Sequence, residues 1–415
     1  MKQMLMHVHG EMLQAALLEN GRLVEFFLEK SKGSGLVGNV YKGRVVNVLP
    51  GMQAAFVDIG LAKNAFLYID ELLHPHLEKQ PKRKPSIKEL VNPGQELLVQ
   101  IMKEPIGGKG ARVTTHFTLP GRWLVYMPNA DYVGVSKKIG PESERGRLRS
   151  IGEKLREKEE GIIMRTAAEG ESEQSLHSDV TRARALWHAI ADRGERLPAP
   201  SELHKEAGLM RRVFRDTLKT DMDEIWIDDA ASLDEAAELL QEMTPGLQGR
   251  LKLYEPRNGQ ALFDWFRVGM QVEKAFERRI SLPSGGHLVW EETEALTVVD
   301  VNTGKFTGSH DLEDTVFRTN MEAADEIARL LRIRDVGGII IVDFIDMQHE
   351  QHRERVMQRM NEKARDDRTK TTVLGWTRLG LLEMTRKKAR ENAAMQLTGR
   401  CASCGAASRR ETANK

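Results

Sequence analysis

The fold is decided by two apolar segments in the last third of the chain: ALTVVDVN at residues 295–302 and GIIIVDFID at residues 338–346. Each has the length of one buried strand. Between them, residues 312–335 place apolar side chains three and four positions apart, the spacing of one helical face. This order predicts a βαβ unit with two parallel strands in a sheet that is covered on both faces.

Polar side chains stand near the ends of both predicted strands. Parallel strands carry their C-terminal ends to one edge of a sheet, so we expect Asp300 and Asp343 to meet there, with Asn302 beside them. These oxygen donors suit Mg²⁺, which can polarise a phosphodiester and activate a water. Asp346 would alternate to the opposite strand face, so we leave it outside the ligand set. The alternative, that the aspartates cap strands or helices, stays open.

Composition restricts the class of protein. The 415 residues carry 62 Lys and Arg against 61 Asp and Glu, and 40% are hydrophobic, which predicts a globular chain of about two to four domains. No apolar run reaches the ~18–20 residues of a membrane helix, and no signal core is present, so we expect a cytoplasmic chain without a membrane partner. Two cysteines exclude a disulfide framework.

Short strands dominate the first part of the chain. Asn20-Gly21 is a strong hairpin dipeptide between two strand-like segments. GSGLVG at residues 33–38 matches the glycine pattern of dinucleotide sites, but a strand-like segment follows instead of a helix, which excludes that function. Strands at regular spacing then suggest a small barrel, and they are predicted at residues 40–48, 53–58, 65–69 and 96–103.

The segment YKGRVVNVLPGMQAAFVDIG at residues 41–60, continued by AFLYIDEL at residues 65–72, resembles an S1-type OB-fold. Such barrels bind single strands by stacking bases on exposed aromatic side chains beside a basic groove. Phe56 and Phe66 are the candidate stacking residues, and Lys109 in the GGKG loop is the candidate phosphate contact. The alternative is that both phenylalanines belong to the barrel core.

The middle of the chain mixes strand-like segments with amphipathic stretches. Residues 123–128 and 161–166 are strand-like, and the highly charged stretch 142–160 predicts a solvated helix. Amphipathic helices are predicted at residues 173–191 and 201–218, with an LPAP segment between them.

The two segments that decide the fold, with DLEDTVFRTNMEAADEIARLLRIRDVGG between them and RLGLLEMTRKK at residues 378–388, resemble the catalytic core of the ribonuclease E/G family. The resemblance covers essentially the whole chain, and DVN and VDFIDM are specific motifs. It implies Mg²⁺-dependent endonucleolytic cleavage of single-stranded RNA, in RNA processing or decay, with 5′-phosphate and 3′-hydroxyl products. By this resemblance Asp300 and Asp343 hold the Mg²⁺, and Asn302 positions the scissile phosphate.

The resemblance also implies a pocket for the 5′-monophosphate of the RNA. The family builds it from a glycine and a valine in one strand and an Arg-Thr pair after another, which Gly121, Val125, Arg165 and Thr166 match. A guanidinium grips a terminal phosphate bidentately, and a hydroxyl adds a directed hydrogen bond. A bulkier triphosphate would fit poorly, so we expect a preference for monophosphorylated ends.

Further RNA contacts follow from the same resemblance. Phe56, Phe66 and Lys109 match the S1 contacts of the family, and Lys137 and Lys370 stand where some members have arginine. Lysine there keeps the attraction to phosphate but loses the fork geometry of a guanidinium.

The CASC segment at residues 401–404 has no cysteine partner elsewhere in the chain. Structural zinc needs four ligands, and one chain offers two thiolates, those of Cys401 and Cys404. The family is known for a zinc link between protomers, which implies a homodimer that shares one Zn²⁺. Two free thiols in a frayed tail are the alternative. Longer members continue into a small domain that assembles tetramers, and this chain resembles a short form without it.

The predicted architecture is a multidomain α/β and α+β protein. The resemblance implies an RNase H-like subdomain at 1–35 plus 209–275, an S1 barrel at 36–116, a 5′-sensor domain at 117–208, a DNase I-like catalytic domain at 276–396 and a zinc-link tail at 397–415.

Other functions compete with this one. The main alternative is a non-catalytic RNA-binding protein that uses the S1 barrel in ribosome assembly or translation. A DNA nuclease of the same chemistry would show no dependence on the 2′-hydroxyl, and no DNA partner is expected.

His349 and His352 could ligate a metal, but at the start of a charged helix we expect a solvated face instead.

Overall fold

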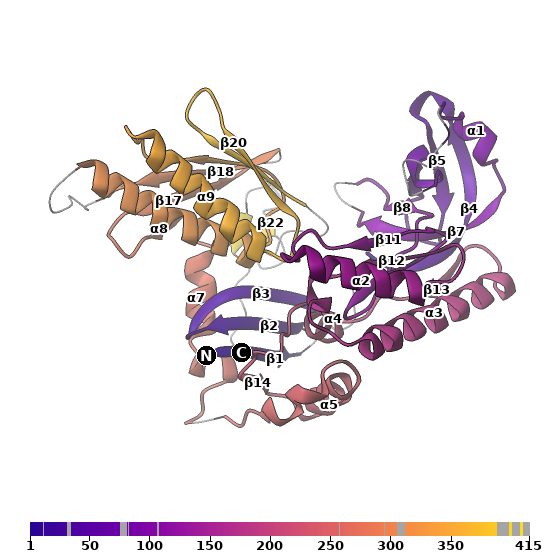
Figure 1. Cartoon of the computed structure of the whole chain (residues 1–415), viewed down its shortest axis with the longest axis horizontal. Helices are drawn as coiled ribbons and strands as arrows, with labels where there is room; N and C mark the ends of the chain where they lie inside the picture. Colours follow the sequence, from indigo (N-terminus) through magenta and orange to yellow (C-terminus); the bar gives the residue numbers. More distant parts are fainter. Residues whose placement is uncertain are drawn as a thin grey trace. The chain divides into compact units, whose positions relative to one another are not determined.

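We describe the protein from a computed structural model of the chain (Figure 1). The structure describes residues 1–10, 12–30, 35–74, 81, 83–105, 108–256, 258–293, 295–304, 312–387, 398–400 and 407–409. The chain divides into two compact units: Met1–Gly33 with Leu209–Lys415, and Ser34–Gly208. Within the described ranges, no helix is both long and apolar enough to cross a membrane.

The first unit contains a five-stranded sheet of order β15-β14-β1-β2-β3. β1 is parallel to β14, so the N-terminal strand lies beside a strand from the second half of the chain. The predicted turn at Asn20-Gly21 joins β2 to β3, and both residues have the positive φ that a type I′ turn requires. The strands are β1 (Lys2–His9), β2 (Met12–Glu19), β3 (Arg22–Lys30), β14 (Glu224–Ile227) and β15 (Leu251–Leu253).

The pleat of this sheet divides its side chains between two cores. Met4 and Met6 of β1 pack in one core with residues of α4 (Leu209–Asp216) and α5 (Ala230–Met243). Leu5 projects to the other face and joins the core of a second sheet in the same unit. The five-stranded sheet is therefore buried on both faces.

The second sheet of this unit has the order β16-β17-β18-β19-β21-β20. β18 and β19 are parallel and are joined through α8 (Leu312–Ile333), as the sequence predicts, while the other neighbouring pairs described in this sheet are antiparallel. The strands are β16 (Arg279–Ser281), β17 (His287–Glu292), β18 (Leu296–Asn302), β19 (Gly338–Asp343), β20 (Thr371–Trp376) and β21 (Leu382–Arg386).

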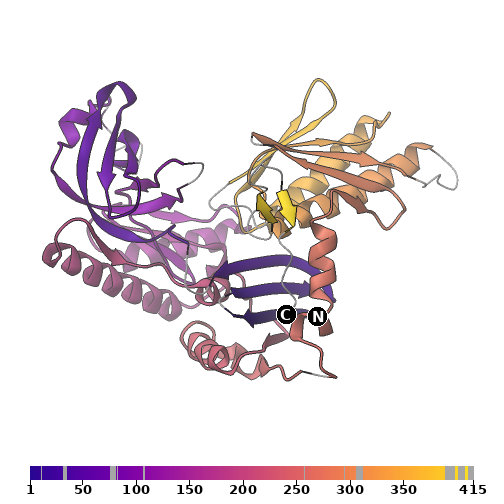
Figure 2. The same ribbon diagram turned by 180° about the vertical axis from the view of Figure 1, so that it is seen from behind.

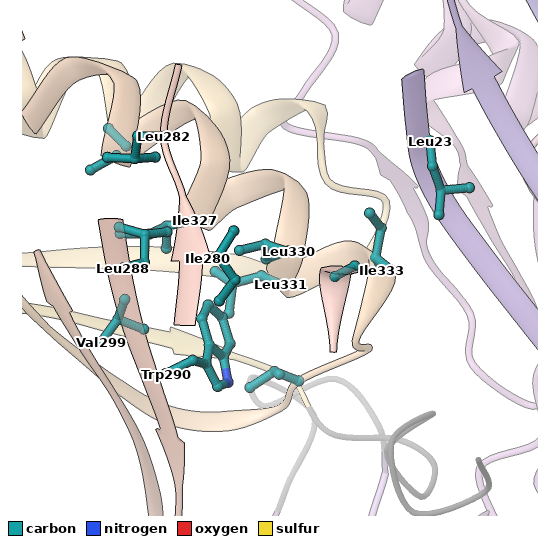
Figure 3. Packing of buried hydrophobic residues seen from close by; sticks show 14 of the residues in the cluster. Leu23, Ile280, Leu282, Leu288, Trp290, Val299, Ile327, Leu330, Leu331 and Ile333 are labelled. Atoms are coloured by element: carbon teal, nitrogen blue, oxygen red, sulfur yellow. The ribbon is translucent and has the colours of Figure 1, made fainter. Parts of the chain in front are cut away.

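Helices α8 and α9 (Glu350–Asp366) lie on the same face of this six-stranded sheet (Figures 1 and 2). Alternate residues of β17, β18, β19 and β21 face the helices and are buried, and Figure 3 shows Leu288, Trp290 and Val299 of the sheet beside Ile327 and Leu330 of α8. We call the opposite face the outer face. The predicted cover on both faces is wrong: Ile339 of β19 is 51% exposed there. One parallel pair in a mainly antiparallel sheet needs only one crossover helix.

The second unit contains a closed barrel whose strands pair in the order β4-β5-β6-β8-β7, with β4 also paired to β7. The closed five-stranded barrel is consistent with an OB-type fold. Short helix α1 (Ile87–Leu90) packs on β4. The strands are β4 (Val40–Leu49), β5 (Ala54–Asp58), β6 (Ala65–Tyr68), β7 (Glu96–Lys103) and β8 (Arg112–Thr114).

The helix predicted over residues 201–218 is wrong in its first part. β13 (Ser201–His204) pairs with β4 at the side of the barrel, and helix α4 begins only at Leu209, after Gly208. Hydrogen bonding to a distant strand overrides the weak helical preference of this segment. The amphipathic spacing alone carries no information about that partner.

The same unit holds a four-stranded sheet of order β11-β12-β10-β9 with α2 (Glu142–Leu155) and α3 (Glu173–Arg196) packed on it. A buried polar network ties α3 to this sheet. Tyr126 donates to Glu160 at 2.8 Å, and Arg184 of α3 donates to both oxygens of Glu160 at 2.7 Å. The strands are β9 (Leu119–Pro120), β10 (Leu124–Pro128), β11 (Val133–Val135) and β12 (Glu160–Met164). The other described elements are α6 (Leu262–Trp265), α7 (Val268–Ala275), β22 (Thr398–Arg400) and β23 (Ala407–Arg409).

A buried ion pair lies at the end of β21, the strand between β19 and β20 in the six-stranded sheet. Arg386 donates through Nε to Asp367 Oδ2 at 2.7 Å and through Nη1 to Asp335 Oδ1 at 2.8 Å. Burial acts to raise the pKa of Asp367, but hydrogen bonds and the charge of Arg386 outweigh it and hold this pKa below its ordinary value. The folded state therefore favours the ionised carboxylate.

Asp367→Ala should lower the free energy of unfolding by about 3–5 kcal/mol, because it leaves a buried guanidinium without its main counter-charge. Urea denaturation measures this loss, with the exposed neighbour substitution Asp366→Ala as control. The pKa of Asp367 is lower in the folded state than the value of about 3.9 in the unfolded state. The pair therefore makes its full contribution to the free energy of unfolding above about pH 3.9, and this contribution is lost as the pH falls through the lower pKa of the folded state. The gap between wild type and Asp367→Ala should therefore narrow below about pH 4. A constant gap would contradict the ionised pair.

Candidate active site

The predicted carboxylates meet on the outer face of the six-stranded sheet. Asp300 of β18 and Asp343 of β19 are direct partners across the parallel ladder, so their side chains project from one face. Asn302 ends β18 on the same face and donates from Nδ2 to Asp300 Oδ2 at 2.7 Å. Asp343 is exposed, and the other two side chains are half-buried. The three residues form one cluster near the C-terminal ends of two parallel strands.

Like charges act on this cluster. Partial burial raises the pKa of Asp343, and the negative charges of Asp300 and Asp346 raise it further. β19 ends at Asp343, so the strand alternation that we used to set Asp346 aside does not extend to that residue. The sequence offered one sign of this, because the apolar run breaks after Val342. Asp346 therefore belongs to the electrostatic surroundings of the pair.

β17 adds a histidine that the sequence analysis missed. His287 lies directly opposite Asn302 in the antiparallel pair of β17 and β18, so it also projects from the outer face. Partial burial and the charge of Arg279 lower the pKa of His287, against an opposing effect of Asp300. The net effect favours the neutral imidazole. Only the register of two antiparallel strands reveals it, and no local sequence pattern carries that register.

The donor chemistry fits a hard divalent cation. Two carboxylates paired across a ladder, with a third close enough to raise the pKa of one of them, repel one another until a cation balances them. Mg²⁺ takes one or two protein carboxylates and completes its shell with water and substrate oxygens. Among the described residues, no group of three or more His, Cys, Asp or Glu forms a site made of protein ligands alone. Asp300 and Asp343 are the residues that could hold a cation here.

Neutralising Asp343 should stabilise the metal-free protein. In EDTA, Asp343→Asn should raise the free energy of unfolding by roughly 0.3–1 kcal/mol, since it removes repulsion that solvent screens only in part. Thermal and urea unfolding measure the change. Glu354→Gln, on the exposed side of α9, changes the net charge equally and should have a smaller effect. A less stable Asp343→Asn would show that this carboxylate makes a favourable contact instead.

The barrel carries its two candidate aromatic residues away from its core. Phe56 and Phe66 are paired across β5 and β6, and their rings lie 6.0 Å apart at 71°. Both are half-buried, whereas their strand neighbours Val57 and Leu67 are fully buried in the barrel core. The alternative that the two phenylalanines form the core is therefore wrong. The pair presents aromatic surface on the outside of the barrel.

Lys109 is exposed on the segment that leads into β8. β8 pairs with β6 through Arg112 and Phe66, which brings this segment to the aromatic pair. Gly110 makes the approach possible, because a Cβ there would lie 2.0 Å from the carbonyl oxygen of Asn64. The structure thus brings the predicted lysine and the two aromatic residues to one side of the barrel.

The four residues predicted to bind a 5′-phosphate lie together at the four-stranded sheet, Val125 in β10 and the other three in segments next to its strands. Arg165 directly follows β12, and its Nη1 donates to the carbonyl oxygen of Gly121 at 2.7 Å. Val125 of β10 is paired with Ile163 of β12, two positions before Arg165. Thr166 is next in sequence and exposed. The guanidinium is thereby tied to the turn that carries the glycine.

Asp179 of α3 holds the backbone of the turn that contains Gly121. Its buried carboxylate accepts hydrogen bonds from the backbone N–H groups of Trp123 at 2.8 Å and Leu124 at 3.3 Å. A Cβ on Gly121 would lie 2.4 Å from the same carboxylate, so only glycine fits. On the other side, the Thr166 hydroxyl lies 2.9 Å from the hydroxyl of Ser136.

The two remaining lysines occupy different places. Lys137 is exposed and follows Ser136, so it stands beside Thr166. Lys370 directly precedes β20. Thr371, the first residue of β20, pairs with Arg386 of β21, and Arg386 pairs with Gly338 at the start of β19. The structure therefore places Lys370 at the opposite end of the sheet from Asp343. The two predicted zinc ligands, Cys401 and Cys404, lie outside the described residues.

A closed OB-type barrel together with a sheet that carries paired carboxylates is typical of an enzyme that acts on nucleic acid. The model of the Ribonuclease E/G family matches residues 118–389. The chain is 45% identical to ribonuclease G of Haemophilus influenzae over 408 residues, 97% of this chain and 82% of that protein. It is 44% identical to ribonuclease G of Escherichia coli K12 over 97% of this chain and 83% of that protein. With ribonuclease E of a Nostoc species, identity is 38% over 94% of this chain and 56% of that protein. The chain belongs to the ribonuclease E/G family.

Proposed function

We propose that this protein is a Mg²⁺-dependent endoribonuclease that hydrolyses single-stranded RNA, prefers 5′-monophosphorylated ends and leaves 5′-phosphate and 3′-hydroxyl products. Membership of the ribonuclease E/G family, with relatives named ribonuclease G and ribonuclease E, supports the endoribonuclease activity. The observation that carries the proposal is the direct pairing of Asp300 with Asp343 on an outer sheet face, with Asn302 hydrogen-bonded to Asp300.

Asp300 and Asp343 would hold the cation, which when bound supplies polarisation of the phosphodiester and a lowered pKa for water. Asn302 orients the Asp300 carboxylate through its Nδ2 hydrogen bond. The same carboxamide stands at the end of β18, where its second N–H can donate to a phosphate oxygen of the substrate. Because these groups project from a strand pair rather than from a loop, their spacing is fixed before substrate binds.

Substrate selection is assigned to the unit Ser34–Gly208. Phe56 and Phe66 would stack on bases, an interaction worth about 1–3 kcal/mol per base and tolerant of sequence. Lys109 would attract the adjoining phosphate. Arg165 and Thr166 would bind the terminal phosphate, since the Gly121 carbonyl already orients the guanidinium. Lys137 beside this pocket and Lys370 on the six-stranded sheet are proposed as weaker phosphate contacts.

The domain assignment is part of the same proposal. We assign residues 1–35 plus 209–275 to an RNase H-like subdomain and residues 276–396 to a DNase I-like catalytic domain. The barrel supports an S1 domain at 36–116, and the sheet of β9 to β12 supports a 5′-sensor domain at 117–208. The chain divides into its two compact units after Gly33 and after Gly208. This division supports the insertion of the S1 and 5′-sensor domains, as one piece, into the RNase H-like subdomain.

The cleavage of three short single-stranded RNAs that differ only at the 5′ end tests the proposal. Wild type in Mg²⁺ should cut the 5′-monophosphate RNA fastest, ahead of the 5′-hydroxyl and 5′-triphosphate forms, and EDTA should abolish cutting. Asp300→Asn or Asp343→Asn should lower kcat by at least about 10³-fold, because each removes a charged metal ligand. Gel analysis of end-labelled RNA measures the rates.

The control for the end preference is Arg165→Gln, which should equalise the three rates and leave kcat on 5′-hydroxyl RNA unchanged. Equal rates in wild type would contradict the sensor while leaving the nuclease intact. Tight RNA binding without any cleavage would favour the non-catalytic RNA-binding protein, which the external aromatic pair on the barrel also allows.

We also propose a homodimer that shares one Zn²⁺ through Cys401 and Cys404 of each chain. The proposal is supported by the paired strands β22 and β23, which flank this segment in the sequence and bring Arg400 and Ala407 side by side. Cys401→Ser with Cys404→Ser should give monomers by light scattering and lose one zinc per two chains by elemental analysis. A double variant that remains dimeric with its zinc content unchanged would contradict the shared site.

A further inference from the structure

The loop between β19 and α9, residues 344–349, carries Asp346, and side chains of α8 hold its backbone by hydrogen bonds. Asn320 of α8 is fully buried, with 0% exposure. Its Nδ2 donates to the carbonyl oxygen of Ile345 at 2.8 Å, and its Oδ1 accepts from the N–H of Ile345 at 3.1 Å. One carboxamide thus pairs both backbone groups of the residue directly before Asp346.

Glu313 of α8 also binds the backbone of this loop through hydrogen bonds. It lies two helical turns before Asn320 on the same side of α8 and is 8% exposed. Its carboxylate accepts from the N–H groups of Gln348 at 3.0 Å and His349 at 3.2 Å. These amides stand at the start of α9, where helical N–H groups have no partner within the helix and a negative charge is favourable.

Glu313 is itself held in place. His352 of α9 contacts it through Nδ1 at 2.7 Å, and the imidazole stacks on Phe317 with ring centroids 4.3 Å apart. The Arg355 guanidinium lies 4.8 Å from the centre of the Phe317 ring. The solvated face that we expected for His352 is therefore wrong, because α8 packs against this part of α9. The contacts with α9 therefore fix the orientation of the Glu313 carboxylate, which binds the loop.

Burial of apolar residues alone would already anchor this loop. Phe344 is 4% exposed and Met347 is 3% exposed, and both belong to the core under the sheet. Such anchoring leaves the peptide planes between them free to rotate, since apolar packing is non-directional. The carboxamide of Asn320 removes that freedom at Ile345, the position between Phe344 and Asp346. Its two hydrogen bonds therefore set a direction, which the apolar contacts do not.

We propose that Asn320 is a positioning residue for the reaction: it fixes the backbone at Ile345 while Glu313 fixes Gln348 and His349, so that Asp343 at the end of β19 and the nearby charge of Asp346 keep the placement that cation binding and hydrolysis require. This inference rests on the proposed function. Asn320 acts from α8, on the face of the sheet opposite the carboxylates, and touches neither them nor the substrate. Partners of this kind orient the groups that bind a metal, and their loss typically lowers metal affinity or activity.

The test compares Asn320→Asp with Thr319→Val in the full chain. Asn320→Asp keeps the size of the side chain but loses the donor to the Ile345 carbonyl. Thr319 is equally buried, and its hydroxyl donates to the Thr315 carbonyl of the same helix at 2.9 Å, so Thr319→Val perturbs α8 and leaves the described hydrogen bonds to the loop in place. Glu313→Gln is a second loop variant in case Asn320→Asp does not fold.

Three readouts separate positioning from stability. The kcat of Asn320→Asp on 5′-monophosphorylated RNA should fall about 10- to 100-fold with KM unchanged, and its affinity for Mn²⁺, measured by electron paramagnetic resonance without RNA, should fall by a similar factor. Amide hydrogen exchange in residues 344–349 should speed up in Asn320→Asp and Glu313→Gln. Thr319→Val should match wild type in all three.

Each outcome decides the inference. Wild-type kcat and Mn²⁺ affinity in a folded Asn320→Asp would overturn it, and so would an equal loss in Thr319→Val, which would show a general effect of the helix. Faster exchange in the loop with weaker Mn²⁺ binding would support it. If wild type cleaves no RNA, the proposed function fails, while the exchange and Mn²⁺ measurements still test the grip on the loop.

Discussion

The two-residue period of β18 and β19 is the constraint on which the rest of the six-stranded sheet depends. Val299 and Val301 face the helices and are buried, and between and beyond them Asp300 and Asn302 face outward. β19 repeats the pattern, with Val342 inside and Asp343 outside. A slip of one residue would bury two carboxylates among apolar side chains, at a cost of several kcal/mol for each. The hydrophobic core therefore fixes the register that pairs the aspartates.

α8 links this core to the geometry of the site. Its apolar side covers the sheet through residues such as Ile327 and Leu330, while polar side chains hold the backbone of loops next to the strands. Besides Asn320, Glu322 accepts from the N–H of Ser284 at 3.0 Å, in the connection that leads to His287. One helix thus packs the core and holds backbone groups in the connection before β17 and in the loop after β19.

Local sequence patterns predict the parts of the fold that depend on local physics. The change from continuous apolar runs to three- and four-residue spacing predicted the βαβ unit and the meeting of Asp300 with Asp343, and a dipeptide predicted the turn between β2 and β3. Long-range register was not predictable. The pairing of residues 201–204 with β4, the position of His287 opposite Asn302 and the far location of Lys370 all depend on strands that meet across the chain.

The proposed division of labour follows the two compact units. Apart from Lys370, the residues proposed to select RNA lie in Ser34–Gly208, and those proposed to cut it lie in the remainder of the chain. Under this proposal, a terminal phosphate bound at Arg165 would make base stacking at Phe56 and Phe66 an intramolecular step with a raised effective concentration. The 5′ end would then contribute to the affinity and residence time of the RNA rather than to the chemical step proposed at Asp300 and Asp343. An end preference of this origin depends on the length of RNA between the two contacts, because only a strand that spans both gains from the linkage.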